Sequence, residues 1–582
     1  MSKRSRKPQL AQSRLPLSPA VWALPIILIG AAILFSPALS FQFVFDDRYQ
    51  IAQNPVIVSW SYLPLYFRSH VWGGISAWTN YYRPLFLTAL RSWHELVGLD
   101  TVGWHALPIL MHLVNVGLVF AVARKLADEV TGLIAAALFA VHPVQIETVA
   151  AIYGSTDPMM AAWLLASFWA YLHWKETARF RWVVVATGTF AVALLTKESA
   201  IVFPAVLVAY EVICRSGLFD SGEKQTSNSQ RSAPWVPLAV VGAVVILYLV
   251  VRRAVLGVVL GRVASEVPWS TVLFTAPRSM LSMLRLCVAP YGMSAFYDCP
   301  YVTRPDLHFF VLSLAMVAIC VGVWIWARKT HEPLIVFTAA WGAIALFPVL
   351  NVRYMQEGDF IHIRFLYVPS IALSLLAAIA LRQLFANQRI RVAVAAVLVI
   401  ALAISTRAQV GFLHDNEAMY RRGVAVAPNN RVPKNNLADE YIKAGRLDEA
   451  AALLDDNLRR HPGFWMSSYN RGYIAYRKKN WPEVADYMGR AIANGCEQTD
   501  AYVYRGFALL QLGRTQEAEQ SIRQAIALKP NGRSYHFALG LVLRQELRWD
   551  EALAAFQQEL ALNPNDAGAA AHVADIKARH AR

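Results

Sequence analysis

Two adjacent carboxylates, Asp46 and Asp47, follow the first long apolar run of this 582-residue chain. A carboxylate at a membrane surface can act as a general base on an acceptor hydroxyl. Two neighbouring acids repel each other, which raises the pKa of one of them. A solvated acidic loop is the simpler interpretation of such a pair. The aromatic residues on both sides of it favour a site at the mouth of the apolar segment instead.

A single arginine and a polar pair follow further along the chain. Arg83 lies in the sequence Tyr-Tyr-Arg-Pro-Leu, where it can either hold a phosphate through two parallel hydrogen bonds or extend toward the membrane interface. His112 and Asn115 are three residues apart in the next apolar run, so they share a helix face. Polar groups at that depth face a cavity or a partner helix. Substrate binding and interhelical hydrogen bonding are both open for this pair.

More polar residues occur at the ends of later apolar runs. If the chain crosses the membrane about eleven times, all of them map to the outer side. Convergence of ionisable groups from distant segments predicts a functional site there. The residues are His142, Glu147, Asp157, Lys197, Glu198, Arg353, Glu357, Asp359, His362, Arg364 and Tyr367.

Composition and missing motifs exclude several other classes. Hydrophobic residues make up 56% of the chain, which is high for a soluble protein. The net charge of +16 comes from basic residues beside apolar runs, as expected when they set membrane orientation, so we predict no nucleic-acid binding. Walker, His-Glu-x-x-His and Gly-x-Ser-x-Gly motifs are absent, and we predict neither a metal nor a cofactor. Cys287 and Cys299 can either form a disulfide or stay as free thiols.

The apolar runs predict about eleven membrane spans within residues 1–411. The basic cluster Lys3 to Lys7 and basic residues in alternate loops place the N-terminus in the cytoplasm and the C-terminal part outside. The stretch 271–290 is apolar, but Arg278 and Arg285 lie on one helical face, so we expect an interfacial helix there. The predicted spans lie near residues 21–39, 104–123, 131–146, 158–174, 182–196, 199–214, 235–256, 307–327, 334–350, 366–382 and 391–408.

A period of 34 residues begins after the last apolar run. Proline recurs at positions 428, 462, 530 and 564, and a small residue at 438, 472, 506 and 540. The small residue allows two helices to pack closely, and the proline ends each unit. About four tetratricopeptide repeats are therefore expected over residues 412–582, with a capping helix near 567–582. The predicted fold is all-α: a polytopic membrane domain followed by an α-solenoid.

Taken together, these motifs resemble the transmembrane, tetratricopeptide-repeat O-mannosyltransferases within the GT-C class of integral-membrane glycosyltransferases. The resemblance implies a polyprenyl-phosphate sugar donor, an extracytoplasmic site and the first acid of the pair, Asp46, as the catalytic base. It is carried by Asp46-Asp47, Tyr82-Arg83-Pro84-Leu85, His112 with Asn115, His142 through Glu147 to Asp157, Lys197-Glu198, Arg364 to Pro369 with Tyr367, and the repeats.

The sequence departs from the family pattern at three positions. Gln145 stands where the family tends to have a histidine, Ser155 where it has an arginine, and Ile363 where it has an acid. These changes bear on the sugar and the acceptor more than on the fold. The short loops and the Ala/Arg-rich style are typical of bacterial proteins, which implies an undecaprenyl-type carrier in a bacterial inner membrane.

The expected function is a direct, inverting transfer of mannose or another hexose to a hydroxyl, with protein Ser/Thr as the expected acceptor. Asp46 would take the proton, the oxygen would attack the anomeric carbon, and the lipid phosphate would leave. Arg83, Arg364 or Lys197 would stabilise charge on that phosphate. The repeats would bind the acceptor protein, or would serve self-assembly. A non-catalytic membrane scaffold and a transporter of lipid-linked sugars are the alternative functions.

Overall fold

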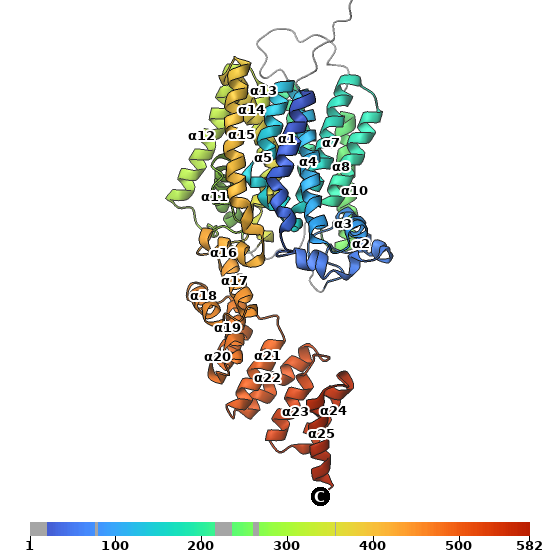
Figure 1. Cartoon of the computed structure of the whole chain (residues 1–582), viewed down its shortest axis with the longest axis vertical. Coiled ribbons are helices and arrows are strands. Elements are labelled where there is room, and N and C mark those ends of the chain that lie inside the picture. Colours follow the sequence, from blue (N-terminus) through green and yellow to red (C-terminus); the bar gives the residue numbers. More distant parts are fainter. Residues whose placement is uncertain (1–19, 76–78, 216–234, 260–266, 356, 582) are drawn as a thin grey trace, which may run out of the picture. The chain divides into compact units, whose positions relative to one another are not determined.

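The computed structural model describes residues 20–75, 79–215, 235–259, 267–355 and 357–581, so the basic cluster from Lys3 to Lys7 lies outside the described residues. Within these ranges the secondary structure is helical, with no strand. The chain divides into two compact units, residues 1–419 and residues 420–582 (Figure 1).

Helices form in the first unit at all eleven places where the apolar runs predict them. The long helices run side by side (Figure 1). A further helix, α11 (Trp269–Val288), covers the stretch predicted to be interfacial, and its interfacial placement stays a prediction. The eleven are α1 (Ala20–Phe35), α4 (Thr101–Leu126), α5 (Glu129–Val141), α7 (Thr156–Thr177), α8 (Arg181–Thr196), α9 (Phe203–Arg215), α10 (Trp235–Leu256), α12 (Leu307–Thr330), α13 (Pro333–Leu346), α14 (Tyr367–Leu384) and α15 (Gln388–Gln409).

Seven helical segments of the described residues are long and apolar enough to cross a bilayer, judged by length and composition. An eighth span results if Glu129–Val141 and Pro143–Ala150, which meet at a bend of 54°, cross together. Arg181–Thr196 is apolar but shorter. These helices support a multi-pass membrane protein, and the count of eleven spans stays a prediction. All five cysteines, which lie in described segments, are free thiols.

The break after α5 shapes the region where the site lies. α5 ends at Val141 because His142-Pro143 follows, and Pro143 starts a short 3-10 turn before α6 (Ile146–Ala150). A second 3-10 turn (Ile152–Ser155) then leads into α7. The chain folds back closely at Gly154, where a Cβ atom would lie 2.4 Å from the carbonyl oxygen of Glu147. Only glycine allows this approach, which brings residue 154 back against the backbone of Glu147.

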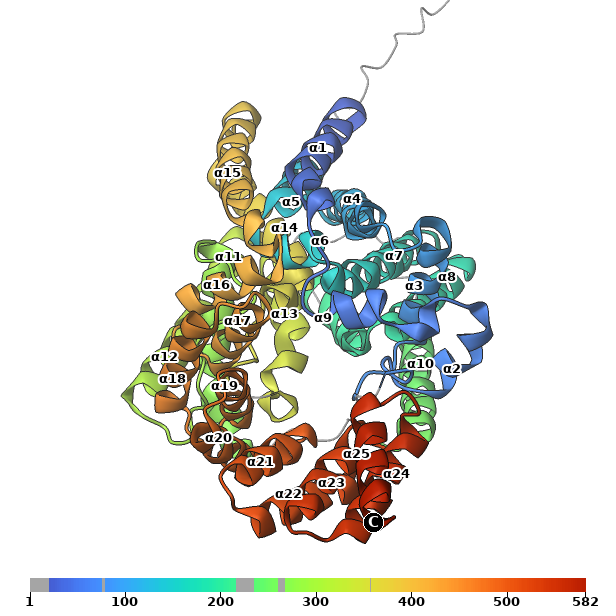
Figure 2. The ribbon, with the colours of Figure 1, turned by 60° about the horizontal axis from the view of Figure 1, so that its bottom comes forward.

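The second unit consists of helix pairs with the predicted 34-residue period, so the repeat fold is confirmed. Consecutive helices follow one another along an arc (Figure 2). Small residues lie where the two helices of a pair meet: a Cβ at Gly540 would lie 2.6 Å from the Phe556 ring. The pairs are α17/α18 (Arg431–Lys443, Leu447–Arg460), α19/α20 (Trp465–Arg477, Trp481–Ala493), α21/α22 (Asp500–Gln511, Thr515–Leu528) and α23/α24 (Tyr535–Gln545, Trp549–Leu562), followed by the capping helix α25 (Ala567–His580).

Candidate active site

Asp47 joins the first loop to the break between α5 and α7. Its side chain is fully buried; Oδ1 accepts a hydrogen bond from the backbone N–H of Tyr153 (2.6 Å) and Oδ2 accepts one from that of Val44 (3.1 Å). Burial raises the pKa of Asp47 to about 8, although the backbone hydrogen bonds act in the opposite direction. With both oxygens engaged, this carboxyl is suited to holding the loop rather than to meeting a substrate.

Asp46 differs from its neighbour in both exposure and contacts. Its side chain is only partly buried, and no described residue hydrogen-bonds its carboxylate. Burial raises the pKa of Asp46, the positive charge of Arg364 lowers it, and the negative charge of Asp359 raises it further. The result is a carboxylate that is more basic than an ordinary aspartate and is not used by the fold. Both properties suit a general base.

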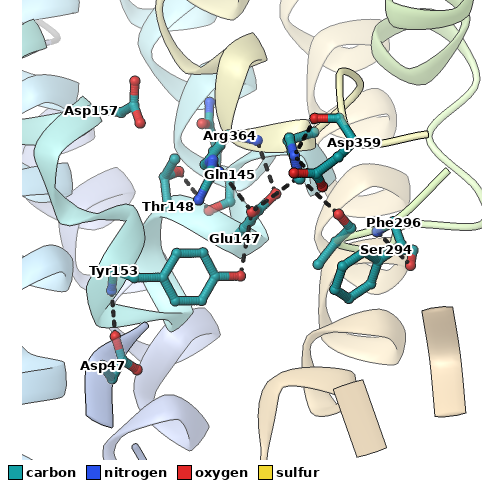
Figure 3. A network of polar contacts seen from close by, with 12 residues as sticks. Asp47, Gln145, Glu147, Thr148, Tyr153, Asp157, Ser294, Phe296, Asp359 and Arg364 are labelled. Carbon is teal, nitrogen blue, oxygen red and sulfur yellow. Dashed lines mark hydrogen bonds and ion pairs between the residues drawn. The ribbon is translucent and has the colours of Figure 1, made fainter. Parts of the chain in front are cut away.

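Glu147 is the centre of a polar network that joins the break to the loop before α14 (Figure 3). Its side chain is 1% exposed, and Oε1 accepts a hydrogen bond from the Tyr153 hydroxyl (3.3 Å). Oε2 accepts one from the backbone N–H of Arg364 (3.1 Å), and the Arg364 guanidinium lies 3.8 Å from Oε1. The same guanidinium lies 5.5 Å from the centre of the Tyr153 ring. Segments around residues 46, 150 and 360 therefore meet at one place.

Two further ion pairs bring cations to this region. Arg83 forms a bidentate pair with Glu198, with Nε to Oε2 at 2.9 Å and Nη2 to Oε1 at 2.5 Å. Lys197 Nζ lies 2.6 Å from Asp157 Oδ1. Burial lowers the pKa of Lys197, Asp157 raises it, and both Arg83 and Arg364 lower it. Lys197 is therefore close enough to both Arg83 and Arg364 for their charges to oppose its own, and a bound anion would relieve that repulsion.

The predicted pair His112 and Asn115 makes contacts inside the protein. His112 Nδ1 lies 2.9 Å from the Tyr367 hydroxyl and Nε2 lies 3.1 Å from the Ala140 carbonyl oxygen. Asn115 donates a hydrogen bond to the same hydroxyl at 3.0 Å. The shared helix face is confirmed, and these bonds connect α4 with α5 and α14. Both ring nitrogens of His112 are engaged, so its structure favours interhelical hydrogen bonding over ligand binding.

His142 is engaged in a similar way. Its Nε2 lies 2.9 Å from the carbonyl oxygen of Cys287 at the end of α11, and its Nδ1 accepts from the backbone N–H of Val144 (3.3 Å). His142 thus caps the turn after α5 and fixes it against α11. It takes no part in the network around Glu147.

The structure adds Tyr153, which the motifs did not indicate, to the site, and it places the predicted residue His362 beside Asp359 and Glu147. Tyr153 contributes its hydroxyl and its backbone N–H, and its only signal in the sequence is its place between Glu147 and Asp157. His362 places Nε2 3.2 Å from Asp359 Oδ1 and Nδ1 4.0 Å from Glu147 Oε1. No group of three or more His, Cys, Asp or Glu side chains that could hold a metal ion occurs within the described ranges.

The fold and the site define a helical membrane protein with tetratricopeptide repeats and a polar site beside its first loop. Residues 84–226 match the family described as dolichyl-phosphate-mannose-protein mannosyltransferase. Residues 393–579 match the family described as the N-terminal domain of the ESX-1 secretion system protein EccA1.

Several curated proteins are similar to the chain, and the three that follow are each named a protein O-mannosyl-transferase. Tmtc1 of Drosophila melanogaster is 31% identical over 29% of this chain and 20% of its own length. TMTC4 of Homo sapiens is 30% identical over 34% of this chain and 30% of its own length. F38B6.6 of Caenorhabditis elegans is 23% identical over 75% of this chain and 63% of its own length. The predicted resemblance to the repeat-containing O-mannosyltransferases is confirmed.

The chain spans less than two thirds of the length of each of these relatives, and only about a fifth of the fly protein. Among solved structures, that of the TPR protein YrrB is 23% identical, covering 28% of this chain and 83% of its own chain with a TM-score of 0.26.

Proposed function

We propose that this chain is a GT-C-type glycosyltransferase that moves mannose or another hexose from a polyprenyl-phosphate donor to a Ser/Thr hydroxyl of an acceptor protein. One observation carries the proposal. The partly buried carboxylate of Asp46, which no described residue hydrogen-bonds, lies near Arg364, and Arg364 and Arg83 each lie near Lys197. This transfer requires a general base and an anion-binding group, and buried side chains hold both of them here.

In the proposed step, Asp46 accepts the proton of the acceptor hydroxyl while that oxygen forms a bond to the anomeric carbon of the sugar. The bond between the anomeric carbon and the phosphate oxygen breaks, and the lipid phosphate leaves with the bonding electrons. Attack and departure occur on opposite faces, so the anomeric configuration inverts. A single carboxylate suffices because no covalent sugar-enzyme intermediate forms.

Arg83, Lys197 and Arg364 would stabilise the negative charge that develops on the leaving phosphate. Glu198 and Asp157 hold Arg83 and Lys197 in place before the donor binds. Glu147 similarly orients Arg364 through the backbone bond and the ion pair described above. This preorganisation favours rapid charge stabilisation because the side chains need not move during the reaction.

The membrane domain and the repeat domain would have different roles in the reaction. Residues 1–411 would bind the donor and carry out transfer, and the repeats of residues 412–582 would select the acceptor protein. The charge distribution of the loops supports an extracytoplasmic site and repeat domain in a bacterial inner membrane. A cysteine introduced after residue 570 should then react with an impermeant thiol reagent in intact cells. Reaction only after permeabilisation would contradict this sidedness.

The proposed function is tested with the purified full chain in lipid nanodiscs. Synthetic polyprenyl-phosphate carrying radiolabelled mannose is supplied together with membrane proteins from cells that lack this chain. We expect label on Ser/Thr residues of those proteins and a matching release of polyprenyl phosphate. Absence of donor turnover, under conditions in which the donor binds, would favour a scaffold. Movement of the intact donor across a bilayer without turnover would favour a transporter.

A further inference from the structure

The loop that carries Asp46 is fixed by the segment that follows the last apolar helix. The side-chain oxygen of Asn416 accepts a hydrogen bond from the backbone N–H of Phe45 (2.9 Å), the residue directly before Asp46. The carbonyl oxygen of His414 accepts one from the backbone N–H of Gln42 (3.0 Å). The His414 ring also packs edge-on against Phe41, with 5.6 Å between ring centres. Segments some 370 residues apart in the sequence are thus joined at the first loop.

Local structure explains why Asn416 points its side chain to this place. Asp415 caps the helix α16 (Asn416–Val426) by accepting a hydrogen bond from the backbone N–H of Ala418 (2.8 Å). The other oxygen of Asp415 pairs with His414 Nδ1 at 2.9 Å. The cap orients the first turn of α16, and the Asn416 side chain, which is 6% exposed, is left to meet the first loop.

Phe45, which donates this hydrogen bond, has an unusual backbone conformation. Phe45 has a φ of +50°, in the left-handed region that residues with a Cβ atom seldom adopt. Such a conformation persists only where its surroundings hold it, and it is a frequent mark of functional sites. The Phe45 ring packs against Tyr153 (5.6 Å between ring centres) and Phe296 (6.3 Å). The Asn416 bond is the polar contact that holds the Phe45 amide in the same turn.

We infer that Asn416 is a positioning residue for the transfer reaction: by holding Phe45 in its left-handed conformation, it directs the Asp46 carboxylate toward the acceptor. This inference rests on the proposed role of Asp46 as the base. Asn416 follows the last apolar helix and begins a helix that continues into the repeat unit, which starts at Tyr420. The reaction geometry would therefore depend on a residue outside the transmembrane motifs. Asn416 itself does not touch the substrate.

Five variants of the full chain in nanodiscs test this inference. Asn416→Leu removes the acceptor at similar size, and Asn416→Asp keeps one. Asn387→Leu is the matched control, because Asn387 also accepts a backbone N–H bond (from Arg389, 2.9 Å) but caps α15 away from the site. Phe45→Gly, made alone and in combination with Asn416→Leu, removes the steric cost of the left-handed turn, since glycine adopts it freely.

Two readouts are followed: amide hydrogen exchange of the peptide that spans residues 42–50, and mannose transfer as described above. Asn416→Leu should speed exchange of this peptide and lower kcat about tenfold, as expected for loss of one buried hydrogen bond, with the KM for the donor unchanged. Asn416→Asp and Asn387→Leu should leave exchange of this peptide near that of the wild type. The double variant Phe45→Gly/Asn416→Leu should have a kcat less than about threefold below that of Phe45→Gly alone.

The outcomes separate this inference from the proposed function. Unchanged exchange of residues 42–50 in Asn416→Leu would overturn the positioning role, as would an equal loss of kcat on the Phe45→Gly background. Faster exchange with full transfer activity would show that the Asn416 contact holds the loop but that Asp46 is not the base. If Asn416→Leu fails to fold, faster exchange or an at least tenfold lower kcat in Asn416→Asp would overturn the inference.

Discussion

The backbone N–H of Tyr153 donates a 2.6 Å hydrogen bond to Oδ1 of Asp47, while the hydroxyl of the same tyrosine donates to Glu147 at 3.3 Å. Tyr153 thus connects the first loop with the network that orients Arg364. This relationship assigns different tasks to the two adjacent acids. Asp47 is bound by the fold, and Asp46 is left with its carboxylate free of hydrogen bonds from any described residue.

The stability of the chain should depend on the protonation of Asp47. Its pKa rises on folding from 3.8 to about 8, because burial favours the neutral form. The stabilisation is therefore fully present below the unfolded pKa near 4, and it is lost as the pH rises through the folded pKa near 8. The unfolding temperature should fall by a few degrees between pH 5 and pH 8. Asp47→Asn, which stays neutral, should flatten this dependence, and an unchanged slope would contradict the assignment.

The partly buried pair of Arg83 and Glu198 should contribute more to stability than a fully exposed pair does. Burial raises the pKa of Glu198, but the charge and hydrogen bonds of Arg83 outweigh that effect and hold the pKa at about 2. Its stabilisation is therefore present above pH 4.5 and lost as the pH falls toward 2. Glu198→Gln leaves the partly buried Arg83 without its counter-charge and should cost about 1–3 kcal/mol in stability.

The control for this variant is Glu517→Gln. Glu517 forms a bidentate pair with Arg514, but the two side chains are 46% and 52% exposed, so the change should cost much less stability than Glu198→Gln does. Thermal unfolding of both variants in nanodiscs gives the comparison. Equal losses of stability would mean that the Arg83 pair is not a preorganised element of the fold.

Two glycines in equivalent repeat positions should respond oppositely to alanine. At Gly540 a Cβ would lie 2.6 Å from the rigid Phe556 ring, so Gly540→Ala should destabilise the repeats by about 1–3 kcal/mol. At Gly472 the nearest atom is the end of the flexible Met488 side chain at 3.1 Å, and alanine favours helix by up to about 1 kcal/mol. Urea unfolding of the repeats, monitored by proteolysis, measures the change in unfolding free energy for each variant. Similar changes for the two variants would contradict the packing described.

Removal of the repeats should separate acceptor selection from donor chemistry, provided that the cut spares Asn416. A chain ending after Met419 should still bind the donor but should transfer poorly to native acceptor proteins. A chain ending at residue 412 should also lose kcat, because it lacks His414 and Asn416, which hold the first loop. Unimpaired transfer to native acceptors by the longer truncation would remove the recognition role from the repeats.

Much of the fold could be predicted from the sequence because its signals are periodic. Apolar runs predicted where helices form, and the 34-residue spacing predicted the repeat pairs and the close approach at Gly540. Composition alone does not settle which helices cross the membrane, since Arg181–Thr196 is shorter than a bilayer-spanning helix.

The site could be predicted only in part. Charged residues such as Asp46, Arg83 and Arg364 are conspicuous beside apolar runs. The backbone N–H of Tyr153, the left-handed turn at Phe45 and the acceptor at Asn416 have no local signature. Their roles come from contacts between segments that are distant in the sequence, and side-chain identity does not encode those contacts.

The comparison of Asp46→Asn with Asp47→Asn in mannose transfer tests the central claim most directly. Donor binding and protein abundance are measured alongside, so that turnover is compared at equal amounts of folded protein. Asp46→Asn keeps the shape of the side chain but cannot accept a proton, so turnover should fall by about 10²–10⁴-fold while donor binding survives. Asp47→Asn should cost much less, because the Asp47 carboxyl holds the first loop through the backbone N–H groups of Tyr153 and Val44 and does not take the proton of the acceptor. Near-normal turnover by Asp46→Asn would contradict the account, and loss of activity in Asp47→Asn alone would reverse the roles of the two acids.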